Sequence, residues 1–506
     1  MREIHHLDGR VELDDHSPLA GSPLYNEDLA PIRVADRNWS TYNYAALWIS
    51  MAHCIPTYML ASGLIAAGMS WGQALATILL GNLIVLVPIL ANSHAGTKYG
   101  IPFPVFARAA YGTVGSNLPA LMRAVVACGW FGIQCWIGGQ ALHTLMTSVW
   151  KAWPSLLGKF DGAPHGIFSV AGTTGTQLLC FLVFWALNIA IVYRGMNLLR
   201  KVENWAAPYV LAMTALLVAW ALWRVHQLRP DESMLGPILA QSGTFHSTRE
   251  FLKVFFPSLT AMIGFWATLS LNMPDFTRFG RSQRDQAFGQ VVALPTTMTV
   301  FAAMGVLITS ASAVIYGKAI WDPVELVGRF STPWVVALSM FTVVVATLSV
   351  NIAANVVSPA NDFANALPRL ITFRTGGLIT GIIGILMQPW RLIADPSGYI
   401  FNWLLGYSGG LGSIAGVLIA DYWLVRQTRL QLADLYQPRG VYGGWSLPGT
   451  LATLAGCALA WVGLVWTPLA FLFDYAWFVG FFVAGGVYSA MMLGRPSTAS
   501  AIEPHG

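Results

Sequence analysis

The sequence predicts an all-α integral membrane protein with twelve membrane-spanning helices, arranged as two inverted repeats of five helices followed by two more. Three observations predict this class. Of the 506 residues, 55% are hydrophobic and only 10% are charged, whereas a soluble domain carries about 25% charged residues. Twelve apolar stretches are long enough to cross a hydrocarbon core of about 30 Å. Two of them, five spans apart, are interrupted, which is typical of transporters built from inverted repeats.

The apolar stretches divide the chain into five parts. They are centred near residues 55, 83, 132, 182, 211, 265, 302, 346, 382, 411, 457 and 484. We expect an N-terminal tail over 1–40, a first repeat over 41–230, a second repeat over 251–430, two peripheral helices over 445–495 and a C-terminal tail over 496–506. Most of the 28 Lys and Arg residues lie on the side that a cytosolic amino terminus places inside. The positive-inside rule therefore predicts a multi-pass protein of the cytoplasmic membrane with both tails in the cytosol.

The first interrupted helix runs from Asn43 to Gly68 and carries His53, Cys54 and Pro56 at its centre. Proline removes a backbone donor and clashes with the carbonyl four residues earlier, so we expect carbonyls near His53 to lose their helical partners. Such groups are tolerated at membrane depth only where they face protein or a polar cavity. His53 titrates near neutral pH and is a candidate for proton coupling. A neutral histidine bonded to another helix is the alternative interpretation.

The third span places Trp130 and Gln134 four residues apart, so they share one helix face. A flat ring beside an amide that both donates and accepts suits a planar, hydrogen-bonding heterocycle. A core tryptophan and a glutamine that joins two helices would give the same pattern.

Two further spans carry candidate site residues. The second interrupted helix, over 255–279, has Phe265 and Trp266 at its predicted break, as an opposite aromatic wall or as packing at a kink. In the eighth span Asn351 and Asn355 lie one turn apart. Two asparagines at that depth are costly unless they face partners or water, so we expect a functional face there.

Other function classes find little support in the sequence. Acidic residues lie near the ends of the spans, so a charged cargo would lack a counter-ion, and we expect a neutral one. There is no HExxH, GxSxG or Walker-type motif. We therefore expect no enzyme activity and no cofactor other than a co-transported cation. The expected partners are a small-molecule substrate and the lipid bilayer, with no nucleic acid and no obligate protein partner.

Several strings resemble a known family between residues 26 and 495. They are NEDLAP, HAGTKYGIPFPV, RGMNLLRKVENWAAP, FWATLSLNMPDFTRF, ATLSVNIAANVVSPA and IADYWLV. The chain resembles the nucleobase:cation symporter-1 family, and within it the branch of allantoin permeases and a plant plastid nucleobase transporter. The resemblance implies a LeuT-like fold, with discontinuous helices 1 and 6, and import of hydantoins, allantoin, uracil, cytosine or purines.

The resemblance also implies roles for individual residues. Trp130 and Gln134 match the family's stacking tryptophan and amide, and Trp266 matches the tryptophan on the opposite face. Asn355 matches a substrate amide and Asn351 a nearby polar position. Cys54 stands where the family has an amide, so one expected substrate contact is missing.

The family's sodium site is matched only in part. Its helix 1 carbonyls correspond to Ser50 and His53, its helix 8 carbonyl to Ala346, and its hydroxyls to Ser349 and Val350. Because Val350 has no hydroxyl, we expect a degraded sodium site and proton coupling.

Together these observations predict a secondary transporter that imports a neutral planar nucleobase or ureide by cation symport with alternating access. Coupling to protons is preferred over sodium. The alternatives are a sodium-coupled hydantoin symporter and, from a different class, a membrane receptor that binds substrate without transporting it.

Overall fold

The computed structural model describes residues 2–160, 169–194, 196–240, 243–394 and 398–493, and almost all of its regular structure is helical. The predicted C-terminal tail over 496–506 lies outside the described residues. In the first half of the chain the strands and helices are β1 (Glu3–His5), β2 (Val11–Leu13), α1 (Thr41–Ala52), α2 (Ile55–Ala66), α3 (Trp71–Tyr99), α4 (Phe103–Tyr111), α5 (Asn117–Val149), α6 (Gly175–Arg194), α7 (Met196–Leu228) and α8 (Gly236–Leu239).

The second half is helical as well. Its α-helices are α9 (Thr248–Phe265), α10 (Ala267–Asn272), α11 (Pro274–Thr277), α12 (Gln283–Tyr316), α13 (Pro323–Gly328), α14 (Pro333–Asn355), α15 (Val357–Ala366), α16 (Phe373–Leu386), α17 (Pro389–Leu392), α18 (Leu405–Ile419), α19 (Leu447–Trp461), α20 (Phe471–Asp474) and α21 (Ala476–Met492). Short 3-10 turns are Ser17–Gly21, Glu27–Leu29, Val34–Asp36, Trp153–Ser155, Ala433–Tyr436, Val462–Leu464 and Thr467–Leu469, and π-helical segments Gly398–Leu404 and Ala420–Val425 flank α18.

The first predicted interruption is present. Helix α1 ends at Ala52, His53 and Cys54 take non-helical conformations, and α2 leaves at 58° to α1. Pro56 lies in the first turn of α2, where a backbone N–H would make no hydrogen bond within the helix, so the proline costs the helix none. The proline therefore starts the second half of the span instead of kinking a continuous helix.

The second interruption is also present, at Trp266. Helix α9 ends at Phe265 and α10 begins at Ala267, with Trp266 between them at φ −102° and ψ 5°. The eighth span is broken too, since α14 ends at Asn355 and α15 begins at Val357. Pro359 accounts for that break, because a proline clashes with the carbonyl four residues earlier, here that of Asn355.

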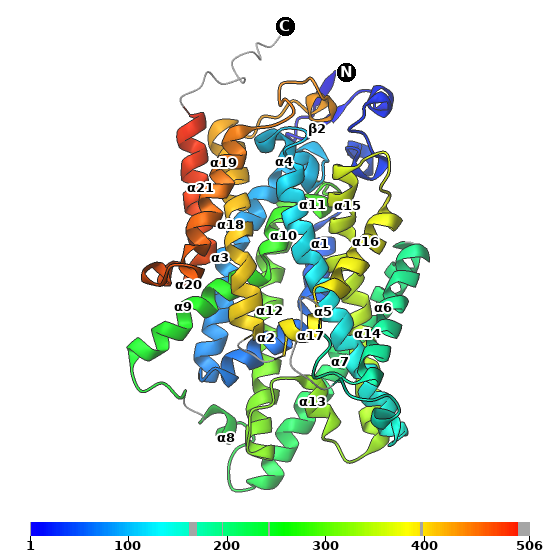
Figure 1. The fold of residues 1–506 in the computed structure, drawn as a ribbon, viewed down its shortest axis with the longest axis vertical. Coiled ribbons are helices and arrows are strands. Elements are labelled where there is room, and N and C mark those ends of the chain that lie inside the picture. The colour runs from blue at the N-terminus through cyan, green and yellow to red at the C-terminus, as the bar shows by residue number, and fades with distance from the viewer. Residues whose placement is uncertain (1, 161–168, 195, 241–242, 395–397, 494–506) are drawn as a thin grey trace.

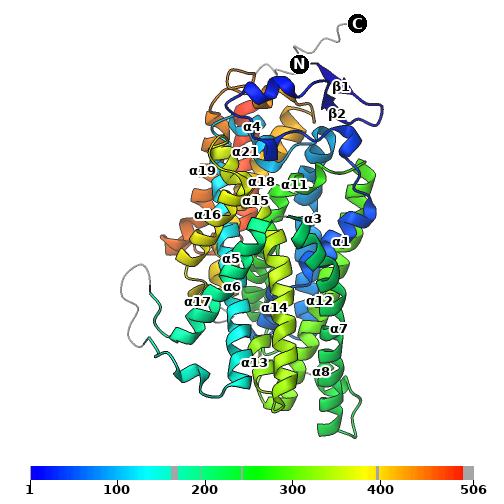
Figure 2. The same cartoon turned by 90° about the vertical axis from the view of Figure 1, so that its right-hand side faces the viewer.

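The long helices form two groups, and α18 contacts helices of both (Figures 1 and 2). In one group α12 packs against α1, α2, α3 and α7. In the other, α5 packs against α6, α14, α15 and α16. Helix α18 contacts α5 of one group and α3, α9 and α10 on the other side. Helices α19 and α21 pack on α18 at one edge of the molecule, in the peripheral place predicted for the last two helices (Figure 1).

The count of twelve spans is not confirmed. Among the described residues, eight helices are long and apolar enough to cross a membrane, or ten if the bent pairs α1–α2 and Thr467–Asp474 with α21 each form one span. The two other predicted spans fall on α9–α11 and on α16. The break at Trp266 divides the first of these, and α16 has only 14 residues.

The first forty residues are more ordered than a tail. Strands β1 and β2 pair in an antiparallel hairpin, which is the one departure from an all-α fold in the described residues. Arg37 is buried and donates to the carbonyls of Val11 and Ile32. The hairpin and the end of α21 lie at the same end of the molecule (Figure 1).

Candidate functional site

Trp130 and Gln134 lie one turn apart on one face of α5. Both are almost fully buried, with 5% and 4% of their surface exposed. The Oε1 atom of Gln134 has no hydrogen-bond partner in the part of the chain that the structure describes. A buried acceptor without a partner costs about 1–3 kcal/mol, so such groups usually have a ligand or water to bind.

A row of aromatic rings joins α5 to the break at Trp266 and to the last turns of α1. Trp130 stands edge-on to Phe265 at 5.3 Å between ring centroids, and Phe265 stands edge-on to Trp266 at 4.9 Å. Trp266 then contacts Trp48 of α1 at 5.1 Å. Within the described residues the Nε1 of Trp266 also lacks a partner. The predicted site residues on α5 and at the α9 break are therefore neighbours, with one donor and one acceptor left open.

The asparagines of α14 form a chain of hydrogen bonds that reaches α5 and α6. Asn355 donates to Oδ1 of Asn351 at 3.0 Å, and Asn351 donates to Oδ1 of Asn188 on α6 and to the carbonyl of Phe131, both at 3.3 Å. Asn351 is thus bonded to protein groups and holds Asn355, which is 7% exposed. Asn188 has no local signal in the sequence that marks this role.

The break in the first span places Cys54 and His53 in different surroundings. The thiol of Cys54 lies 3.3 Å from Oγ1 of Thr57, one turn into α2. The ring of His53 packs at 4.2 Å from that of Phe301 on α12, and its Nε2 has no partner among the described residues. Neither contact tests the proposed roles of these two residues in substrate binding and proton coupling.

The residues matching the family's sodium site lie on two helices in contact, α1 and α14. Ser349, Ala346 and Val350 are buried, whereas Ser50 is half-buried. Val350 offers no side-chain oxygen at its position. The sequence analysis missed Thr347 on the same helix, whose buried Oγ1 has no partner within the described ranges. Its hydroxyl is an additional oxygen on α14, but it stands one residue after Ala346 and not at the matched position.

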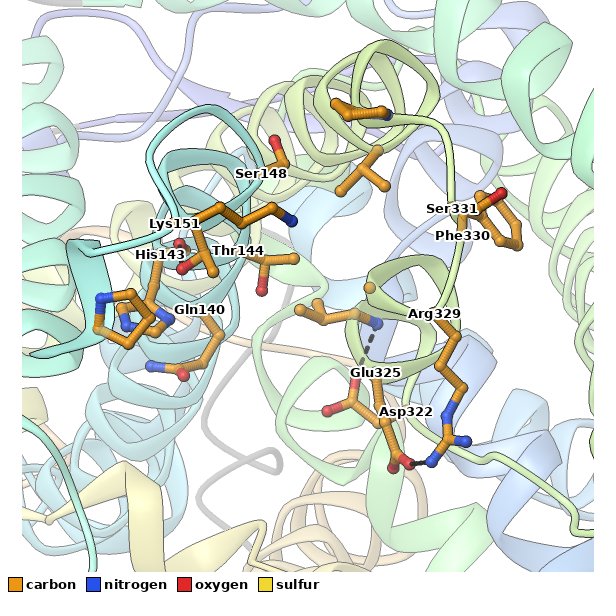
Figure 3. A pocket seen from close by; sticks show the side chains of 16 residues that line it. Gln140, His143, Thr144, Ser148, Lys151, Asp322, Glu325, Arg329, Phe330 and Ser331 are labelled. Carbon is orange, nitrogen blue, oxygen red and sulfur yellow. Dashed lines mark hydrogen bonds and ion pairs between the residues drawn. The ribbon is translucent and has the colours of Figure 1, made fainter.

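A separate cavity of about 520 Å³ opens at the end opposite the β1–β2 hairpin (Figures 1 and 3). Gln140, His143 and Thr144 line it from α5, and Asp322 and Arg329 line it from the α13 region. It contains none of the predicted site residues. Asp322 accepts from the backbone N of Val324, and burial raises the pKa of its carboxyl to about 6.

Comparison with known proteins identifies the family of the chain. Residues 31–480 match the family described as permeases for cytosine/purines, uracil, thiamine and allantoin. The chain belongs to this family. Its members are transporters and not enzymes, so the expectation that the chain is not an enzyme is confirmed.

Individual members of the permease family are similar along nearly the whole chain. The allantoin permease of Bacillus subtilis is 40% identical over 484 residues, covering 95% of both chains. The purine-uracil permease NCS1 of Arabidopsis thaliana is 38% identical over 498 residues, covering 95% of this chain and 80% of that protein. The predicted resemblance to the nucleobase:cation symporter-1 family is therefore confirmed.

A solved structure supports the fold. Mhp1, a nucleobase-cation-symport-1 family transporter in a closed conformation with bromovinylhydantoin bound, has a TM-score of 0.72 at 26% identity. The match covers 94% of this chain and 98% of Mhp1. The LeuT-like arrangement of inverted repeats is thereby confirmed for this permease, apart from the number of spans.

Proposed function

We propose that this permease is a symporter that imports a neutral planar nucleobase or ureide, of the uracil or allantoin type, across the cytoplasmic membrane together with protons. The observation that carries the proposal is the pair Trp130 and Gln134 on one face of α5, which Phe265 joins to Trp266 at the break in the sixth span. It combines aromatic faces with one open acceptor and one open donor. Stacking contributes about 1–3 kcal/mol per base, and the polar edges select among flat rings.

The lack of a charged side chain among these site residues favours a neutral substrate. The polar side chains of the site are amides, indoles and the imidazole of His53, and a fully charged ligand would find no opposite charge among Trp130, Gln134, Trp266 and Asn355. The similarity to an allantoin permease and a purine-uracil permease agrees with this class. Cys54 replaces an amide at the first break, and uracil, the smaller ring, depends least on that contact.

Coupling to protons is proposed because of Val350. Sodium is a hard cation that prefers a full set of oxygen ligands, and an aliphatic side chain removes one of them. His53 is the candidate proton carrier, since it lies at the first break and its Nε2 has no partner among the described residues.

Orientation follows from the basic residues at the end that carries the β1–β2 hairpin. Arg278, Arg281, Arg426 and Arg429 lie there, close to helix ends, and by the positive-inside rule this distribution favours a cytosolic location for that end. We therefore propose that both termini are cytosolic.

Uptake by cells tests the proposal. Cells that express the wild type should accumulate labelled uracil or allantoin, and an uncoupler should abolish accumulation whereas replacing sodium by choline should not. Trp130→Ala should abolish uptake, while Trp150→Ala, on the exposed end of α5, should not. Uptake that stops in choline would favour the sodium-coupled alternative. Saturable binding without accumulation would favour the receptor alternative.

A further inference from the structure

The hydroxyl of Tyr407 bridges three elements at the row of rings. The indole Nε1 of Trp130 donates to Oη of Tyr407 at 3.2 Å. The same hydroxyl donates to the carbonyl oxygen of Gly264 at 2.8 Å. Trp130 lies on α5, Tyr407 on α18, and Gly264 two residues before the break at Trp266. One phenol therefore connects the stacking tryptophan to the backbone of the broken helix.

The directions of these two hydrogen bonds are fixed by chemistry. An indole N–H only donates and a backbone carbonyl only accepts, whereas a phenol hydroxyl does both once. Consecutive hydrogen bonds of this kind polarise one another, so each is stronger in the presence of the other. The orientation of the Trp130 ring is therefore coupled to the position of the Gly264 carbonyl.

Packing restricts the same ring from a second side. Trp403 lies one turn before Tyr407 and contacts it at 5.0 Å between centroids, and it also stands edge-on to Trp130 at 6.0 Å. The six-membered ring of Trp403 lies over Gly129, where any β-carbon would collide with it. Tyr407 itself is half-buried, whereas Trp130 is buried.

We propose that Tyr407 is a positioning residue of the substrate site, which sets the angle of the Trp130 ring for stacking and makes that angle depend on contact between α18 and α9. This inference rests on the proposed function, because it assigns Trp130 as the stacking surface. Substrate that stacks on Trp130 would then favour the state in which the Trp130–Tyr407–Gly264 bridge is intact. A planar ring is selected because the bridge holds the indole in one plane.

Tyr407→Phe removes the bridging hydroxyl and keeps the ring. We expect the Kd for labelled uracil and for labelled allantoin, measured on purified protein, to rise about 3- to 10-fold, because the two neutral hydrogen bonds that hold the Trp130 ring in position are lost. The maximal transport rate should change less than twofold. Tyr422→Phe is the matched control, because it also removes a hydroxyl that is hydrogen-bonded, to His94, but one outside the site. Its Kd should equal that of the wild type.

A double-mutant cycle separates positioning from a structural effect. Trp130→Phe keeps an aromatic face but has no N–H to donate to Tyr407. If Tyr407 acts through Trp130, then Trp130→Phe/Tyr407→Phe should bind no more than twofold more weakly than Trp130→Phe alone. A purely structural loss would instead multiply the two effects and lower the melting temperature.

The outcomes distinguish the inference from the function on which it rests. If Trp130→Phe weakens binding and Tyr407→Phe does not, the positioning role is refuted while the stacking site stands. If Tyr407→Phe weakens binding by the same factor in both backgrounds, the role is refuted as well. If neither probe binds the wild type, or Trp130→Ala binds as well as the wild type, the proposed site fails and the inference fails with it.

Discussion

Replacing Gln134 by methionine should change stability and substrate affinity in opposite directions. Methionine has nearly the same length and volume, so the packing of α5 is kept. In the absence of substrate, the variant removes a buried Oε1 that has no partner among the described residues. That acceptor carries a desolvation penalty of about 1–3 kcal/mol, of which part should be recovered. We expect the substrate-free melting temperature to rise by about 1–2 °C.

With substrate, the same change removes a hydrogen-bonding partner and leaves a polar edge of the ring facing a thioether. The loss of a neutral hydrogen bond together with an unpaired buried group should weaken binding by about 10- to 100-fold. Thermal unfolding of purified protein and equilibrium binding of labelled uracil or allantoin measure the two effects.

A second buried glutamine provides the control. The Oε1 of Gln290 on α12 also lacks a partner among the described residues, but its Nε2 donates to Oγ of Ser93 at 3.1 Å and to Oε1 of Gln286 at 2.7 Å, and methionine would lose both bonds. Gln290→Met should therefore lower the melting temperature and leave the Kd unchanged. A lower melting temperature with an unchanged Kd for Gln134→Met would instead show that Gln134 only joins helices, and would refute our interpretation.

Three further predictions concern other parts of the molecule. The side chains of Arg123 and Asp362 are fully buried, and Nη1 of Arg123 lies 3.4 Å from Oδ2 of Asp362. Arg123→Met should lower the free energy of unfolding by about 3–5 kcal/mol, because it leaves the Asp362 carboxyl buried without its partner. Unfolding measurements check this, and an unchanged melting temperature would contradict it. Burial raises the pKa of the Asp322 carboxyl to about 6. Between about pH 4 and 6 the folded state therefore binds more protons than the unfolded state, and the free energy of unfolding should fall as pH rises through that range. Asp322→Asn should flatten this slope in melting curves, and parallel curves would argue against it. Val350→Ser places a hydroxyl at the degraded cation site. Uptake by this variant should then be faster in sodium than in choline. An equal rate in the two buffers would mean that Val350 does not decide which cation is co-transported.

The breaks in the helices could be predicted because their causes are local. Pro56 and the polar pair before it mark the first break, and Gly264 with the aromatic pair marks the second. The break after Asn355 has an equally local cause in Pro359, which the sequence analysis did not use. The turn at Asp8–Gly9, with Gly9 at φ 82°, is a hairpin signal of the same kind.

The partners of the site residues could not be predicted, because they come from distant parts of the chain. Tyr407 is 277 residues from Trp130, and Asn188 is 163 residues from Asn351. The sequence around one member of each pair does not indicate the other member. Such pairs form only when α5, α6, α14 and α18 pack together. The count of twelve spans is not confirmed for a related reason. An apolar stretch in the sequence does not show where a helix breaks, as at Trp266, or how short it is, as in α16.

The central claim is that this permease moves a neutral heterocycle with a proton. Uptake of labelled uracil and allantoin into proteoliposomes tests it most directly, with purified protein, sodium-free buffer and an imposed inward proton gradient. We predict accumulation of at least one of the two substrates above the external concentration, and its collapse when an uncoupler dissipates the gradient. Accumulation that requires an inward sodium gradient and ignores the proton gradient would contradict the account.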